Sequence, residues 1–164
     1  MKFFLGLIIG LIILPIAAYL YLWSGMAPAA TSAAPMPFEK TIARMSLNAR
    51  IKKEMPPPPT AQPTDATYMA GAMTYKMECA VCHGLPGQDA SNIAKGMFPK
   101  PPQLFKHGVT DDPPGETYWK VENGIRLTGM PGFKGNLSEQ EIWNVTMLLA
   151  NADKIPQSVK DALK

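Results

Sequence analysis

The chain begins with a long apolar segment. Residues 3–23 contain no charged side chain, and only Gly6, Gly10 and Pro15 interrupt the large apolar residues and alanines. A helix of about 20 apolar residues spans the hydrocarbon core of a bilayer, so we predict a transmembrane anchor at residues 1–23. A cleavable signal peptide is the alternative, but its apolar region is normally only about 7–15 residues long, and we therefore favour a retained anchor.

A basic amphipathic helix is predicted at residues 38–55, after a spacer rich in Ala, Pro, Ser and Thr. Phe38, Ile42, Met45 and Ala49 fall on one helical face, and most charged positions around them are Lys or Arg. Such a helix lies on anionic lipid headgroups or against a partner subunit, or it is a solvated linker. The pattern alone leaves these interpretations open.

Four consecutive prolines at residues 56–59 end this helix, because proline removes a backbone donor and fixes φ. Residues 56–64 are therefore predicted to be a stiff Pro-rich linker, and residues 24–64 as a whole a spacer. The remaining residues, 65–164, are predicted to form one domain.

Helical periodicity marks both ends of this domain. The last helix begins with a capping box formed by Ser138 and Glu141, and its apolar rows predict a broad buried face. Pro156 follows this helix, and we expect only a short polar tail after it. The first helix is indicated by five residues at helical spacing, Tyr68, Gly71, Ala72, Tyr75 and Cys79.

The middle of the domain is poor in regular patterns. A short helix is expected at residues 116–123, where Gly124 stops it. Residues 88–114 are rich in turn-forming residues and show no sustained period. A loop of that length is unusual in a compact domain unless it wraps a bound group.

The net charge of +3 is unevenly distributed. Residues 1–63 carry six Lys or Arg and two acids, whereas residues 64–164 carry ten Lys or Arg and eleven acids. The predicted domain therefore has no basic field over its surface, and nucleic acid is not indicated as a partner.

The main chemical motif is the run Cys-Ala-Val-Cys-His at residues 79–83. This run is the attachment signature for c-type haem, in which Cys79 and Cys82 form thioethers and His83 is an axial ligand of the iron. A redox dithiol and half of a zinc site are the alternatives. The dithiol interpretation lacks a preceding strand, and the zinc interpretation leaves only His107 as a further strong donor.

A second iron ligand is expected from a constrained loop. The run Thr-Gly-Met-Pro-Gly at residues 128–132 places Met130 on a non-helical segment between the last two predicted helices. A thioether held there faces one side of a haem ring while His83 faces the other, and such ligation raises the reduction potential. The alternatives are that Met130 only packs on the core, and that His107, which we place on the surface, is the ligand.

Three motifs in this order resemble the class I monohaem cytochromes c of bacterial respiratory chains. They are Cys-Ala-Val-Cys-His-Gly at residues 79–84, Pro-Pro-Gln-Leu at residues 101–104 and Gly-Ile-Arg-Leu-Thr-Gly-Met-Pro at residues 124–131. The resemblance covers about residues 66–152 and implies an all-α class I cytochrome c fold around one covalent haem c. The anchor and the Pro-rich linker precede the part that it covers.

The resemblance also implies roles for individual residues. Pro102 is expected to accept a hydrogen bond from His83, and Leu104 is expected beside it in the haem pocket. Trp143 on the last helix is expected to cross Gly71 on the first. Three further residues are expected near the haem and its propionates, Tyr118, Trp119 and Arg126.

Location and function follow from these expectations. Covalent c-haem maturation takes place outside the bacterial inner membrane, so we expect a single-pass inner-membrane protein with a periplasmic haem domain. No catalytic acid–base pair or nucleophile triad is visible, and we expect electron transfer rather than catalysis. The favoured function is that of a cytochrome subunit of a membrane-bound respiratory complex, exchanging electrons with redox proteins. A free-standing tethered carrier is the alternative, and an open-site haem enzyme or gas sensor is the third possibility.

Overall fold

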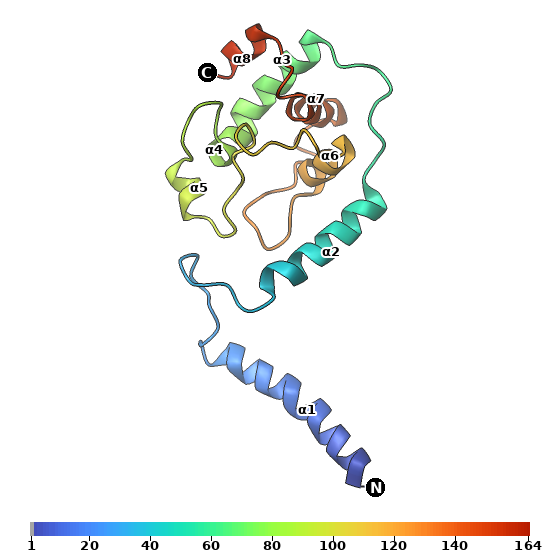
Figure 1. The fold of residues 1–164 in the computed structure, drawn as a ribbon, viewed down its shortest axis with the longest axis vertical. Helices are drawn as coiled ribbons and strands as arrows, with labels where there is room; N and C mark the ends of the chain where they lie inside the picture. Colours follow the sequence, from blue (N-terminus) through green and yellow to red (C-terminus); the bar gives the residue numbers. More distant parts are fainter. Residues whose placement is uncertain (1) are drawn as a thin grey trace. The chain divides into compact units, whose positions relative to one another are not determined.

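The computed structural model describes residues 2–164, which form helices joined by loops and turns (Figure 1). Its contacts divide the chain into two units, one ending at Ile42 and the other covering Ala43–Lys164. The described residues contain no β-strand, and their only strand-like pairing is an isolated bridge between Lys134 and Leu137. The expectation of an all-helical fold is therefore confirmed for this part of the chain.

The first unit contains helix α1, Lys2–Trp23, which includes Pro15. Among the described helices, α1 alone is long and apolar enough to cross a membrane. A signal sequence near the N-terminus can pass the same test of length and composition, so the choice of a retained anchor stays a prediction.

Helix α2, Glu39–Glu54, leaves exposed the apolar row that its sequence predicted. Ile51 is only 3% exposed, whereas Phe38, Ile42 and Met45 of the expected apolar row are 66–75% exposed. The sequence analysis gave weight to the longer apolar row, but the shorter apolar side around Ile51 is the one that packs.

The end of α2 contacts helix α6, Pro114–Asn123. Trp119 Nε1 donates a hydrogen bond to Glu54 Oε2 at 3.2 Å. A Cβ placed on Gly115 would overlap the backbone carbonyl of Pro56, so the chain leaving α2 passes directly over α6. The start of the Pro-rich segment therefore lies on the domain.

The core of the second unit forms where α3, Asp65–Thr74, crosses α7, Glu139–Ala150 (Figure 1). A Cβ on Gly71 would lie 2.8 Å from the carbonyl carbon of Asn144 and 3.1 Å from Leu148 Cβ. Only glycine allows the two helices to approach this closely. The buried apolar cluster around the crossing consists of Ala72, Tyr75, Tyr118, Val121, Ile142, Trp143, Val145, Met147, Leu148, Leu149, Ile155, Val159 and Leu163.

The capping box at the start of α7 is confirmed. Ser138 Oγ accepts a hydrogen bond from the Glu141 backbone N–H, and Glu141 Oε2 accepts one from the Ser138 backbone N–H at 2.8 Å. The Ser138 hydroxyl also donates to Glu141 Oε2 at 2.7 Å, and this bond, together with the one from the Ser138 N–H, lowers the pKa of the Glu141 carboxyl by favouring its charged form. A second capping box, which the sequence analysis missed, joins Thr64 to Thr67 at the start of α3.

The chain after Pro156 is not a polar tail, so this prediction was wrong. It forms helix α8, Gln157–Ala162, which packs against α3. Three apolar residues at spacings of four, Ile155, Val159 and Leu163, are buried there. This spacing is the signal that could have revealed the helix, but the charged residues between them obscured it.

We expect Leu163→Ala to lower the free energy of unfolding by about 2–5 kcal/mol, because the leucine side chain is fully buried. Denaturant unfolding of the haem-loaded protein would measure this loss. Lys160→Ala on the exposed side of the same helix is the control, with an expected change within about 0.5 kcal/mol. A loss of stability in Leu163→Ala as small as that in Lys160→Ala would show that α8 does not contribute to the core.

Candidate functional site

The Cys-His run lies on a continuous helical segment whose turn widens before the first cysteine. Residues Tyr75–Cys79 form the π-helix η1, and Ala80–His83 form the single α-turn α4. Such π-turns are rare and occur frequently at functional sites. Gly84 then ends the segment with φ +72° and ψ 168°, a conformation that is essentially restricted to glycine.

Buried contacts of Tyr75 fix the end of this segment. Its hydroxyl donates a hydrogen bond to the Gly84 carbonyl oxygen at 2.7 Å. Its ring makes an edge-to-face contact with Phe105, with the ring centroids 5.1 Å apart. Burial raises the pKa of Tyr75, so the hydroxyl remains a hydrogen-bond donor at neutral pH. The turn that carries the histidine is thereby tied to the core.

His83 is oriented by the segment that follows it in the chain. Its Nδ1 lies 2.8 Å from the carbonyl oxygen of Pro102, and because a carbonyl only accepts, this nitrogen carries the proton. Burial lowers the pKa of His83, although the bond to Pro102 acts in the opposite direction. A neutral ring with a protonated Nδ1 leaves the lone pair of Nε2 available to a metal.

The environment of Cys79 does not suit a redox dithiol. Burial raises the pKa of its thiol to about 12, and the nearby charge of Glu78 adds to the shift. Reactive dithiols have lowered pKa values, because the thiolate is the nucleophile. Neither Cys79 nor Cys82 forms a disulfide. Among residues 2–164, no three His, Cys, Asp or Glu side chains are grouped closely enough to hold a metal ion, so no zinc site is formed there.

Met130 lies on a loop that is closed by its own hydrogen bonds. The Ile125 N–H donates to the Met130 carbonyl at 3.2 Å, and the Met130 N–H donates to Thr128 Oγ1 at 3.1 Å. The Thr128 hydroxyl in turn donates to the Ile125 carbonyl at 2.7 Å. Gly124, with φ +69° and ψ −176°, connects this loop to the end of α6. The loop therefore holds Met130 in a fixed place relative to that helix.

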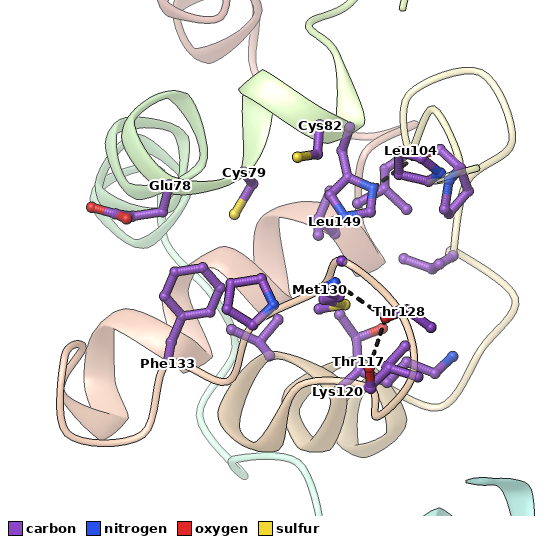
Figure 2. A pocket seen from close by; sticks show the side chains of 18 of the residues that line it. Glu78, Cys79, Cys82, Leu104, Thr117, Lys120, Thr128, Met130, Phe133 and Leu149 are labelled. Carbon is purple, nitrogen blue, oxygen red and sulfur yellow. Dashed lines mark hydrogen bonds between the residues drawn. The ribbon is translucent and has the colours of Figure 1, made fainter. Parts of the chain in front are cut away.

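The cysteines, His83 and Met130 all line one cavity of about 220 Å³. Figure 2 shows Cys79 and Cys82 on the helical segment at one side and Met130 on the loop at the other. By the same measure a water molecule occupies about 10–15 Å³, so the cavity is far larger than a packing defect. The other lining side chains are mostly apolar, including Leu104, Val109, Val121, Ile125, Phe133, Val145 and Leu149.

This arrangement has the donors that a covalent haem requires. Two thiols and a neutral imidazole with a free Nε2 stand at one wall, a thioether stands at another, and apolar side chains fill most of the space between. Cysteine, histidine and methionine are the residue types that hold haem in c-type cytochromes. The residues present therefore fit a haem c.

Not every residue expected around the haem lines the cavity. Pro102 and Leu104 do so, whereas Tyr118, Trp119 and Arg126 are not among the described residues that line it. Tyr118 is instead stacked on Trp143, with ring centroids 4.3 Å apart, and Trp119 binds α2. These two aromatic residues connect α6 to other helices rather than to the cavity.

The expected crossing of α3 and α7 is present. The atoms nearest to a Cβ on Gly71 belong to the Asn144 backbone and to Leu148, and Trp143, the next residue along α7 from Asn144, lies in the buried cluster and stacks on Tyr118 of α6. The direct pairing of Trp143 with Gly71 stays a prediction.

The sequence analysis missed several lining residues. Met97 lies against Gly129 in the loop that carries Met130, and it follows a short helix, α5, Asn92–Gly96, within the segment expected to have no regular structure. Thr117 and Lys120 line the cavity from α6, and Lys120 pairs with Glu116 at 2.6 Å. The Ser91 cap of α5 was the readable signal for that helix.

Comparison with known proteins gives a family match over most of the domain that contains this cavity. The family model described as cytochrome c oxidase, cbb3-type, subunit III matches residues 66–147. No curated protein matches the chain. A chain of the Kuenenia stuttgartiensis reducing HAO-like protein complex is similar at 29% identity, with a TM-score of 0.45. That similarity covers 54% of this chain and 44% of the other, so this chain matches less than half the length of that neighbour.

We expect Gly124→Ala to displace the loop that carries Met130. The added Cβ would lie 2.7 Å from the Pro131 carbonyl carbon and 2.9 Å from the Met130 oxygen, and the backbone conformation itself costs about 1–3 kcal/mol in any residue but glycine. Unfolding experiments and the absorption spectrum of the haem would together show lower stability and altered iron ligation.

Gly135→Ala is the matched control for this substitution. Gly135 also has a positive φ, of +87°, but nothing lies within 4 Å of its Cβ position. This variant should lose stability through backbone strain alone and keep the normal haem spectrum. An unchanged spectrum in Gly124→Ala as well would contradict the role given to Gly124.

Proposed function

Because the chain belongs to the family of cytochrome c oxidase, cbb3-type, subunit III, we propose that it transfers single electrons as a membrane-anchored subunit of a respiratory complex. The family match directly supports a cytochrome c domain that carries electrons on a covalent haem c. The proposal adds which side chains ligate the iron, that α1 is a membrane anchor, and that the chain is a subunit of a complex.

The observation that carries the proposal is that His83 and Met130 line one cavity together with both cysteines. When bound, haem c supplies an iron that takes up and releases one electron. Cys79 and Cys82 would hold haem c through thioethers, and His83 and Met130 would both ligate its iron. An iron with two side-chain ligands would be closed to a substrate or a gas, which favours electron transfer over an open-site enzyme or sensor.

The surrounding residues serve this function by holding their partners still. Pro102 fixes the ring orientation of His83 and keeps its proton on Nδ1. Thr128 closes the backbone around Met130. Leu104 and the other apolar lining residues exclude water, and a thioether ligand in such surroundings raises the reduction potential.

The location in the proposal rests on α1 and on the chemistry of haem attachment. A 22-residue apolar helix is long enough to span a bilayer, and we propose that it is retained as a single-pass anchor in the inner membrane. The haem domain then faces the periplasm, where covalent haem attachment takes place. Its partners are redox proteins that donate and accept electrons at that surface.

Met130→Ala tests the ligand assignment. We expect the variant to lose the absorption band of methionine-ligated ferric haem, to have a lower reduction potential and to gain binding of carbon monoxide. Denaturing electrophoresis with haem staining should show that the covalent haem remains. Met73→Ala, at an exposed position on α3, is the control and should behave like the unmodified protein. Unchanged spectra and no carbon monoxide binding in Met130→Ala would rule out Met130 as the ligand.

Native electrophoresis of gently solubilised membranes separates a complex subunit from a free-standing carrier. We expect the haem-stained band of this chain to migrate with partner subunits, at a mass well above that of one 17.9-kDa chain. Migration as a single chain, with the haem spectrum intact, would favour the tethered carrier instead.

A further inference from the structure

Helix α2 has apolar residues on two opposite sides. On one side Ile51 is buried and Leu47 is half-buried, and Glu54, which is exposed, binds Trp119 from the same side through its carboxylate. Ile42 and Met45, each 66% exposed, point away from that side. At about 100° per residue, the two sides are roughly opposite on the helix. One side of α2 therefore packs on the haem domain, while the other side is exposed in the described residues of that unit.

The charges on α2 give the uncovered side a specific chemistry. Lys52 and Lys53 follow its apolar row and lie roughly 50° to either side of it. Among the described residues, neither forms an ion pair. Both acids of the helix are occupied, because Glu39 accepts a hydrogen bond from the Met36 N–H at 2.8 Å and Glu54 pairs with Arg50 at 2.7 Å. The uncovered side thus combines exposed apolar groups with free positive charge.

The distance along the chain limits what this side can meet. Only residues 24–38 separate the end of α1 from the start of α2. Fully extended, these fifteen residues span about 50 Å at most, and turns within them shorten that reach. If α1 spans a membrane, the start of α2 therefore lies within about 50 Å of the bilayer surface.

We propose that the side of α2 formed by Ile42, Met45, Ala49, Lys52 and Lys53 docks on the anionic surface of the bilayer. The apolar residues enter the headgroup region, and the lysines contact lipid phosphates. Because the other side of α2 is fixed to α6, the haem domain is held in one orientation above the membrane. This inference rests on the proposed membrane anchor and extends it.

A photoreactive benzophenone amino acid in place of Met45 tests the docking. The full-length, haem-loaded protein is reconstituted into vesicles of phosphatidylcholine with or without phosphatidylglycerol and then illuminated. We expect lipid adducts at position 45, several-fold more of them with the anionic lipid. Lys52→Gln and Lys53→Gln should lower the yield by up to about fivefold each, the effect of one basic residue at an anionic surface. The same probe at Met73, also exposed but on α3, is the matched control and should yield few adducts.

Several results would overturn the proposal. A yield at position 45 as low as at position 73 would show that α2 stays in water. A protein adduct at position 45 in native membranes, in place of lipid adducts, would assign this side to a partner subunit. Alkaline extraction of the same vesicles tests the anchor separately. A protein that is extracted would contradict both the anchor and the docking of α2. A protein that stays in the vesicles but forms no lipid adducts would contradict only the docking. The haem spectrum, recorded in every sample, shows that each variant is folded.

Discussion

The close approach of α3 to α7 at Gly71 is the constraint on which the site depends. The helix that begins as α3 continues through η1 into the turn that carries the cysteines and His83. Helix α7 supports α6 through the stacking of Trp143 on Tyr118, and α6 carries the loop of Met130. One wall of the haem cavity is thus continuous with α3, the other is supported by α7 through α6, and α3 and α7 meet at Gly71. A side chain at Gly71 would push them apart, because backbone stands where its Cβ would lie.

The cavity and the buried apolar cluster share side chains. Val121, Val145 and Leu149 belong to the cluster and also line the cavity, and buried residues of α8 extend the cluster next to α3. The cavity walls are tied to the rest of the domain by hydrogen bonds, such as those from Tyr75 to Gly84 and within the loop of Met130. The side chains that would hold haem c therefore project from backbone that is anchored to the core.

The sequence predicted those features whose signals are local. The capping box of Ser138 and Glu141 follows from residues three positions apart, and the Cys-His run needs only five consecutive residues. The chain pattern also pointed to Met130, which the structure places in the same cavity as His83. The sequence also placed Gly71 and Trp143 at the crossing of the two helices, where the structure has Gly71 against the Asn144 backbone and Trp143 in the buried cluster.

The features that the sequence did not reveal depend on tertiary contacts. The buried side of α2 is decided by its packing, not by its longest apolar row, and the core position of Leu163 is decided by the surface of α3. The wider π-turn before Cys79 leaves no mark in the hydrophobic period. Trp119 was expected near the haem because the resemblance indicated only its position along the chain. The resemblance does not extend to α2, so it could not reveal that Glu54 of α2 binds Trp119.

The central claim is that His83 and Met130 ligate one iron from opposite walls of the cavity. X-ray absorption at the iron edge of the purified protein tests this most directly, because sulfur and nitrogen neighbours scatter differently. We predict one sulfur neighbour and a histidine nitrogen beside the four ring nitrogens, with the sulfur lost in Met130→Ala. An iron with no sulfur neighbour, or one that keeps its sulfur in that variant, would contradict the account.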